Sequence, residues 1–199
     1  MDFISDMAAW SQKISEEFND LEPIFEERSD THHARVFDWR MRELDSSLLM
    51  GVRSVFAIAM NLSGEVLLVD HPKRGWEICG GHLTKAEVEQ GNVIQALHRE
   101  VREESGHKIT KPSIAFLNLV HNFARANNKE LHCPYPVHSL MAYFTCDIVK
   151  KVSDSLLDDI RGAKTFPLGT AIKLVRPRNK AILEHLNESW SYYLKEKTR

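Results

Sequence analysis

The sequence lacks a long apolar run. No stretch of about eighteen apolar residues occurs, as a transmembrane helix would require, and Asp2 and Asp6 lie where a secretory signal would carry positive charge. We therefore expect neither a membrane span nor a secretory signal, and no membrane partner.

An excess of one charge sign is also missing. The 26 basic and 28 acidic side chains give a formal net charge of -2, so no global field collects nucleic acid or an anionic membrane. Any recognition of phosphate must then be local, and a nucleic acid polymer is not an expected partner.

Cysteine is scarce. Cys79, Cys133 and Cys146 are odd in number, widely spaced and free of any C-x-x-C pair, which is typical of a reducing compartment. We therefore expect a cytoplasmic protein. The 199 residues, 43% of them hydrophobic and 27% charged, suit one globular domain with added helices.

Hydrophobic periodicity predicts two helices at the start of the chain. The first ends at Pro23 and has a helical stripe made of Ile4, Met7, Ile14, Phe18 and Leu21. The second begins at Asp30 as N-cap and carries Ala34, Phe37, Met41, Leu44 and Leu48 on one side. Residues 1–50 are thus expected to form a helical extension that packs on its own domain, with a homodimer contact as the alternative.

Strand patterns follow in the middle of the chain. Residues 52–59 and 65–69 predict a hairpin across Ser63-Gly64, while 114–121 and 137–149 predict further strands. Between these last two, the polar segment 124–136 with its two prolines predicts a long loop.

The end of the chain returns to helical spacing. After Pro177, the apolar residues Ile182, Leu183, Leu186, Trp190, Tyr193 and Leu194 predict an amphipathic helix over 177–199. Strands with one central helix and flanking helices indicate a layered α/β/α domain, which we place at 51–176.

The segment Gly75–His107 carries the chemistry. Its helix can turn Ala96, Leu97 and Val101 to the core, and three glutamates at i, i+3 and i+4 project from a common face: Glu100, Glu103 and Glu104. Carboxylates so close repel one another unless a cation lies between them. Oxygen-only ligands favour Mg²⁺, or Mn²⁺ in its place, and Mg²⁺ characteristically bridges carboxylates to substrate phosphates.

Arg99 and Gly106 frame this glutamate cluster. Arg99 lies four residues before Glu103, close enough on a helix for an ion pair that orients this carboxylate. A carboxylate held beside metal-bound water can accept its proton. Gly106 supplies a stop at the helix C-terminus.

The run R-E-V-R-E-E-S-G resembles the second half of the Nudix box, G-x5-E-x7-R-E-U-x-E-E-x-G-U, with U apolar. The front half departs from the pattern, because Gly81 in W-E-I-C-G-G-H-L lies four residues too far from Arg99. We infer an insertion within 84–89. Asn92 then replaces the first glutamate of the box, Cys79 a usual proline and His107 the closing apolar residue. A solvated charged helix face is the alternative interpretation.

The resemblance implies an α+β fold, a Nudix-type α/β/α sandwich around a mixed sheet with N-terminal and C-terminal helical additions. It also implies a magnesium-dependent hydrolase of phosphoanhydrides in nucleoside diphosphate-linked or nucleoside triphosphate-type substrates. Glu100 and Glu104 become principal metal ligands, with Glu103 a ligand or general base, the Gly81 carbonyl a further ligand and Arg99 the residue that orients them.

Residues outside the box are open to two interpretations. Lys73, Arg74 and Trp76 can bind substrate phosphates and base, or form a solvated loop with a core tryptophan. The resemblance to the family also makes Asp158 and Asp159 candidate bases, with capping or solubility as the alternative role. The group His121, His132, Cys133 and His138 matches no compact zinc pattern and suits a substrate loop, with structural zinc as the alternative.

Two other functions stay open. Asn92 and the stretched box suit a catalytically weak Nudix-like domain that binds a nucleotide or a protein. The same fold also serves isoprenoid diphosphate isomerases, which need a reactive cysteine, and Cys79 beside the glycine pair is a loose candidate.

Overall fold

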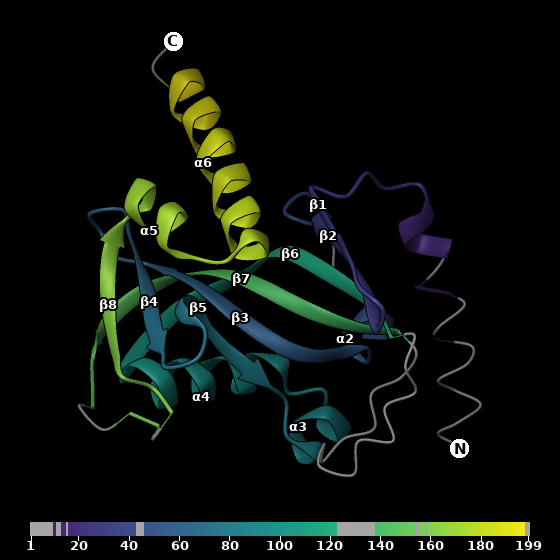
Figure 1. Cartoon of the computed structure of the whole chain (residues 1–199), viewed down its shortest axis with the longest axis horizontal. Coiled ribbons are helices and arrows are strands. Elements are labelled where there is room, and N and C mark those ends of the chain that lie inside the picture. Colours follow the sequence, from purple (N-terminus) through teal and green to yellow (C-terminus); the bar gives the residue numbers. More distant parts are fainter. Residues whose placement is uncertain are drawn as a thin grey trace. The chain divides into compact units, whose positions relative to one another are not determined.

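The computed structural model describes residues 10, 13–14, 16–42, 46–122, 138–153, 156–157 and 159–197. The elements, labelled in Figure 1, are β1 (Phe25–Arg28), β2 (His32–Asp38), α2 (Ser46–Leu49), β3 (Val52–Met60), β4 (Glu65–His71), β5 (Gly75–His82), α3 (Lys85–Gln90), α4 (Val93–Ser105), β6 (His107–Asn122), β7 (His138–Lys151), β8 (Gly162–Pro167), α5 (Leu168–Leu174) and α6 (Pro177–Lys197).

Hydrogen bonding orders the strands as β1-β2-β6-β7-β3-β5-β4-β8. The chain divides into two compact units, one of residues 1–56, 81–97 and 114–144, the other of residues 57–80, 98–113 and 145–199. The long strands β3, β6 and β7 contribute segments to both units. Among the described residues, no helix is both long and apolar enough to cross a membrane.

In the first unit, β2 pairs antiparallel with β1 on one side and with β6 on the other. The pairing with β6 runs from His32↔Asn122 to Asp38↔Phe116. The helix predicted from Asp30 is therefore wrong over 32–38. The strand buries Ala34, Val36 and Phe37, and the pairing with β6 satisfies its backbone polar groups, an interaction that local spacing cannot reveal.

The rest of the predicted N-terminal extension is partly described. Residues 13–14 and 16–19 are helical, with Ile14 and Phe18 buried as expected. Phe18 stacks on Trp39 at 5.1 Å between ring centroids. Met41, expected on a packed face, is exposed, and three stripe residues lie outside the described residues: Ile4, Met7 and Leu44.

In the second unit, the expected hairpin is confirmed. Strands β3 and β4 pair antiparallel at Met60↔Val66. Gly64 adopts a φ of 75° in the connecting turn, where the Asn61 side chain accepts from the backbone N–H groups of Ser63 and Glu65. A left-handed φ is a conformation that glycine adopts without steric cost.

Strand β4 also pairs with β5 and β8, neither of which the sequence analysis predicted. Helix α5 packs on β4, β8 and α6. The predicted C-terminal helix is confirmed as α6, where Ile182, Leu183 and Leu186 are buried. The strands predicted at 114–121 and 137–149 are found as β6 and β7, whereas the loop at 124–136 lies outside the described residues.

Candidate active site

Helix α4 carries the three glutamates, as the spacing predicts. Its apolar side, Ala96, Leu97 and Val101, is buried and fixes the rotation of the helix. Glu100 and Glu104 are each only 7% exposed. Carboxylates are rarely buried to this extent unless a charged or hydrogen-bonding group pairs with them. The helix therefore places two of the three carboxylates in poorly hydrated surroundings.

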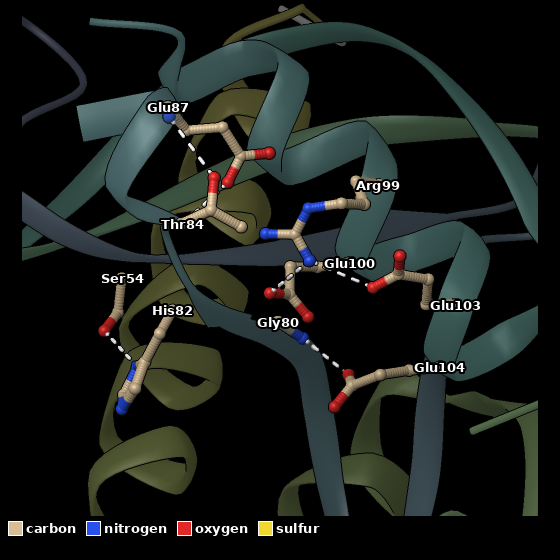
Figure 2. Close-up of polar contacts among 9 residues, drawn as sticks. All are labelled: Ser54, Gly80, His82, Thr84, Glu87, Arg99, Glu100, Glu103 and Glu104. Carbon is tan, nitrogen blue, oxygen red and sulfur yellow. Dashed lines mark hydrogen bonds and ion pairs between the residues drawn. The ribbon is translucent and has the colours of Figure 1, made fainter. Parts of the chain in front are cut away.

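Arg99 bridges two of these carboxylates. Its Nη1 donates to Oε1 of Glu100 and to Oε2 of Glu103, each at 2.9 Å (Figure 2). The ion pair predicted between Arg99 and Glu103 is present, and the same guanidinium also holds Glu100. A charged hydrogen bond to each carboxylate restricts both side chains in orientation.

Glu104 has a different partner. The backbone N–H of Gly80, in β5, donates to Oε2 of Glu104 at 2.8 Å (Figure 2). Burial, joined by the negative charges of Glu100 and Asp159, raises the pKa of Glu104 to about 8, although the Gly80 hydrogen bond and the charge of Arg74 act in the opposite direction. A positive charge brought to this carboxylate would relieve the cost.

The donor set suits a hard divalent cation in chemical type. It consists of carboxylate oxygens, the ligands that Mg²⁺ and Mn²⁺ prefer, and includes a buried carboxylate whose charged form is disfavoured without a cation. In the part of the chain that the structure describes, however, no three His, Cys, Asp or Glu side chains are gathered to hold a metal ion. The guanidinium of Arg99 instead satisfies Glu100 and Glu103.

The front of the box requires a correction. Counting forward from Gly81 over five residues reaches Glu87, which fits the G-x5-E half of the pattern. Glu87 is buried and forms a capping box on α3, in which its Oε2 accepts from Thr84 N–H and the Thr84 hydroxyl accepts from Glu87 N–H. Glu87 therefore takes the place that the sequence analysis assigned to Asn92.

The extra residues of the box accordingly lie between Glu87 and Arg99. Helix α3 ends at Gly91, a left-handed C-cap with φ 66°. Asn92 stands between the two helices, and its amide donates to the Gln90 side chain at 2.7 Å. The glycine and the glutamate thus keep their ordinary interval, and the extra residues lie after Glu87.

Lys73, Arg74 and Trp76, the predicted substrate-binding residues, lie at the β4–β5 turn and the start of β5. Lys73 is exposed, and its backbone N–H donates to Nδ1 of His71 at 3.2 Å. Trp76 packs edge-on against Phe166 with ring centroids 4.8 Å apart. Of the three, Arg74 is the one whose charge acts on Glu104.

The sequence analysis missed two residues, Glu77 and Arg176, that form an ion-pair network with Arg74. Glu77 pairs through Oε2 with Arg74 Nε at 2.7 Å and through Oε1 with Arg176 Nε at 3.4 Å. The two arginine side chains remain 44% and 51% exposed, whereas that of Glu77 is 15% exposed. Arg176 is remote in sequence from β5, so only folding brings it to this carboxylate.

Asp158 lies outside the described residues, as do His132 and Cys133. Asp159 is exposed, and its Oδ2 lies 3.7 Å from Nε2 of His71. The negative charge of Asp159 also helps to raise the pKa of Glu104, a residue of the same unit.

A family model of the NUDIX domain matches residues 50–186. The chain therefore belongs to the NUDIX domain family, which confirms the resemblance seen in R-E-V-R-E-E-S-G. The structure is similar to that of a Bacillus subtilis pyrophosphohydrolase, with a TM-score of 0.50 and 19% identity over 71% of this chain and 77% of that chain. This similarity confirms the expected α+β fold.

Other solved structures give similar matches. A NUDIX hydrolase from Nitrosomonas europaea matches with a TM-score of 0.49 and 24% identity, over 69% of this chain and 90% of that chain. An Ap4A hydrolase from C. elegans matches with a TM-score of 0.46 and 19% identity, over 70% and 98%. No curated protein sequence matches the chain.

Proposed function

We propose that this protein is a metal-dependent pyrophosphohydrolase that cleaves a phosphoanhydride bond of a nucleoside diphosphate-linked or nucleoside triphosphate-type substrate. The observation that carries the proposal is the state of Glu104, a buried carboxylate beside Glu100 whose pKa is raised to about 8. A carboxylate in such surroundings gains most from a dication, and a dication at this position can also bind diphosphate.

Mg²⁺, with Mn²⁺ as a substitute, would be held by Glu100 and Glu104, and Glu103 would be either a further ligand or the general base. When bound, it would offset charge on the bridging and leaving oxygens and acidify a bound water. Arg99 holds Glu103 in one orientation, from which this carboxylate accepts the proton of the attacking water. Asp159 is a second candidate for the same role.

Arg74 and Arg176, which both form ion pairs with Glu77, would bind the substrate phosphates. Arg74 and Arg176 are half-exposed and already oriented by a carboxylate, and guanidinium groups bind phosphate oxygens in bidentate fashion. Lys73 adds a further positive charge, and Trp76 offers a ring for the base on the side that Phe166 does not cover.

Cys79 argues against the isomerase alternative. Its side chain is buried, and desolvation raises the pKa of the thiol well above its ordinary value, with the nearby Glu104 adding to the effect. Because the thiolate is the reactive form of cysteine, this residue is poorly suited to act as a nucleophile or acid at neutral pH.

We further propose a cytoplasmic location, supported by the scarce cysteines of the sequence, and a small-molecule substrate. Within the chain, residues 51–176 would form the catalytic domain and 177–199 a helix that packs on it. A homodimer through the N-terminal segment remains the alternative to packing within one chain.

The test is phosphate release from a panel of nucleoside diphosphate derivatives and triphosphates, with and without Mg²⁺. We expect metal-dependent turnover that Glu103→Gln lowers by at least about 10²-fold. Glu184→Gln, which removes an exposed helical ion pair with Lys180, is the matched control and should retain full turnover. Thermal stabilisation by a nucleotide without turnover would instead support the binding-only alternative.

A further inference from the structure

Glu77 on β5 brings together two arginines from distant parts of the chain. Arg74 lies in the β4–β5 turn, and Arg176 immediately precedes α6. Each pairs through Nε with a different oxygen of the Glu77 carboxylate, and all three residues belong to the second unit. Two positive charges therefore share one negative charge, which leaves an excess of positive charge at this point.

Both guanidinium groups have donors beyond the nitrogen that pairs with Glu77. Nη1 and Nη2 of an arginine carry four N–H groups in addition to that on Nε, and both arginine side chains are about half-exposed, so an anion from solvent can reach them. Glu77 itself is largely buried. A guanidinium already held by a carboxylate is oriented in advance for the planar, bidentate binding of phosphate oxygens.

The arginine pair also lies close to the glutamate cluster on α4. The positive charge of Arg74 acts on Glu104, a residue of the same unit, and lowers its pKa. A phosphate held by Arg74 is therefore within electrostatic reach of the carboxylates at which a metal-bound diphosphate would lie.

The two substrate classes of the proposed function differ in the group beyond that diphosphate. A terminal phosphate, with a second pKa of about 6, carries roughly 1.5 to 2 negative charges at pH 7 and offers three acceptor oxygens. In a nucleoside diphosphate sugar, an uncharged sugar takes this place. An excess of positive charge with several N–H donors matches the terminal phosphate and gains little from the sugar.

We propose that Arg74 and Arg176, oriented by Glu77, bind the terminal phosphate of the substrate and thereby select nucleoside triphosphates over diphosphates linked to an uncharged group. The inference rests on the proposed function, whose two substrate classes it separates. Arg176 is the specificity-determining residue of the pair, because its removal leaves Arg74 and the glutamate cluster in place.

Binding of inorganic tripolyphosphate tests the anion site without a nucleotide. The titration is calorimetric, on the full-length protein in saturating Mg²⁺ and in a Glu103→Gln background, where we expect little turnover. We expect a dissociation constant of about 1 mM or below, which Arg176→Ala raises at least about 10-fold. Arg176→Gln keeps most of the side-chain stem and should show the same loss.

Lys180→Ala is the matched control for Arg176→Ala. Lys180 lies one turn into α6, and its side chain has the same exposed fraction as that of Arg176, 51%. The substitution removes an equal charge and should leave the tripolyphosphate affinity unchanged. Equal affinity in the parent protein and in Arg176→Ala would overturn the proposal.

Steady-state kinetics tests the selectivity. We expect kcat/KM for nucleoside triphosphates to exceed that for the matched diphosphate sugars at least about 10-fold. Arg176→Ala should remove this preference by raising KM for the triphosphates, with kcat and the diphosphate sugars nearly unaffected. A diphosphate sugar cleaved as efficiently as every triphosphate would overturn the selectivity and leave the proposed function standing, whereas no turnover with any substrate would refute both.

Discussion

The backbone N–H of Gly80 and Oε2 of Glu104 form a 2.8 Å hydrogen bond that joins β5 to α4. Glu104 lies four residues after Glu100 on the same helix, and both carboxylates are buried. One backbone hydrogen bond lowers the pKa of Glu104 but does not offset the desolvation and the repulsion that raise it. The charge state of Glu104 should therefore report the presence of a cation.

The first prediction concerns pH in the metal-free protein. The Glu104 carboxyl ionises near 4.5 in the unfolded chain and near 8 in the folded one, so the folded state binds the extra proton between these values. Its contribution to stability is complete below about pH 4.5 and is lost as pH rises through 8. In a chelator, the melting temperature of the wild type should fall relative to Glu104→Gln between pH 5 and 8 and then level off.

Addition of Mg²⁺ should reverse this relative loss in the wild type and leave Glu104→Gln unaffected. Thermal unfolding curves at several pH values check both statements. Parallel pH profiles for the two proteins would contradict the first of them.

The second prediction concerns Arg99. A single guanidinium nitrogen donates to both Glu100 and Glu103, and lysine offers a more flexible point charge in its place. We expect Arg99→Lys to lower kcat about 10-fold, equivalent to about 1.4 kcal/mol, with KM and the melting temperature nearly unchanged.

Arg102→Lys, an exposed position on the same helix, is the control for this substitution. Steady-state kinetics with a substrate from the panel separates kcat from KM. An effect of Arg99→Lys no larger than that of the control would refute an orienting role.

The third prediction concerns Gly106, which needs glycine for two reasons. Its φ is 70°, and a Cβ at this position would lie 2.0 Å from the backbone oxygen of Ser153. The Gly106 carbonyl accepts hydrogen bonds from Val152 and Ser153 N–H, so the backbones cannot separate freely. We expect Gly106→Ala to lower the free energy of unfolding by about 2–4 kcal/mol.

Gly64→Ala is the matched control, because Gly64 has φ 75° but open space around it. This substitution should cost only about 1–2 kcal/mol, the conformational term alone. Urea unfolding of the two variants measures both losses. Equal losses would show that the close approach to Ser153 carries no cost.

The sequence alone was sufficient for the features that depend on local spacing. The period of the apolar residues located α4, and the interval between Arg99 and Glu103 predicted their ion pair, because a helix determines which side chains are neighbours. The same reasoning failed at His32–Asp38. Apolar residues there suited a helical stripe, but pairing with β1 and β6 made the segment a strand.

What the sequence by itself determined was the family, through R-E-V-R-E-E-S-G, and the helical turn on which Glu100, Glu103 and Glu104 stand. Only the tertiary structure decided three contacts. The Gly80 N–H donates to Glu104, Arg176 pairs with the same carboxylate, Glu77, as Arg74, and His121 is hydrogen-bonded to His138. Each of these contacts joins segments far apart in the chain. The packing of the whole fold sets such distances, and no local pattern encodes them.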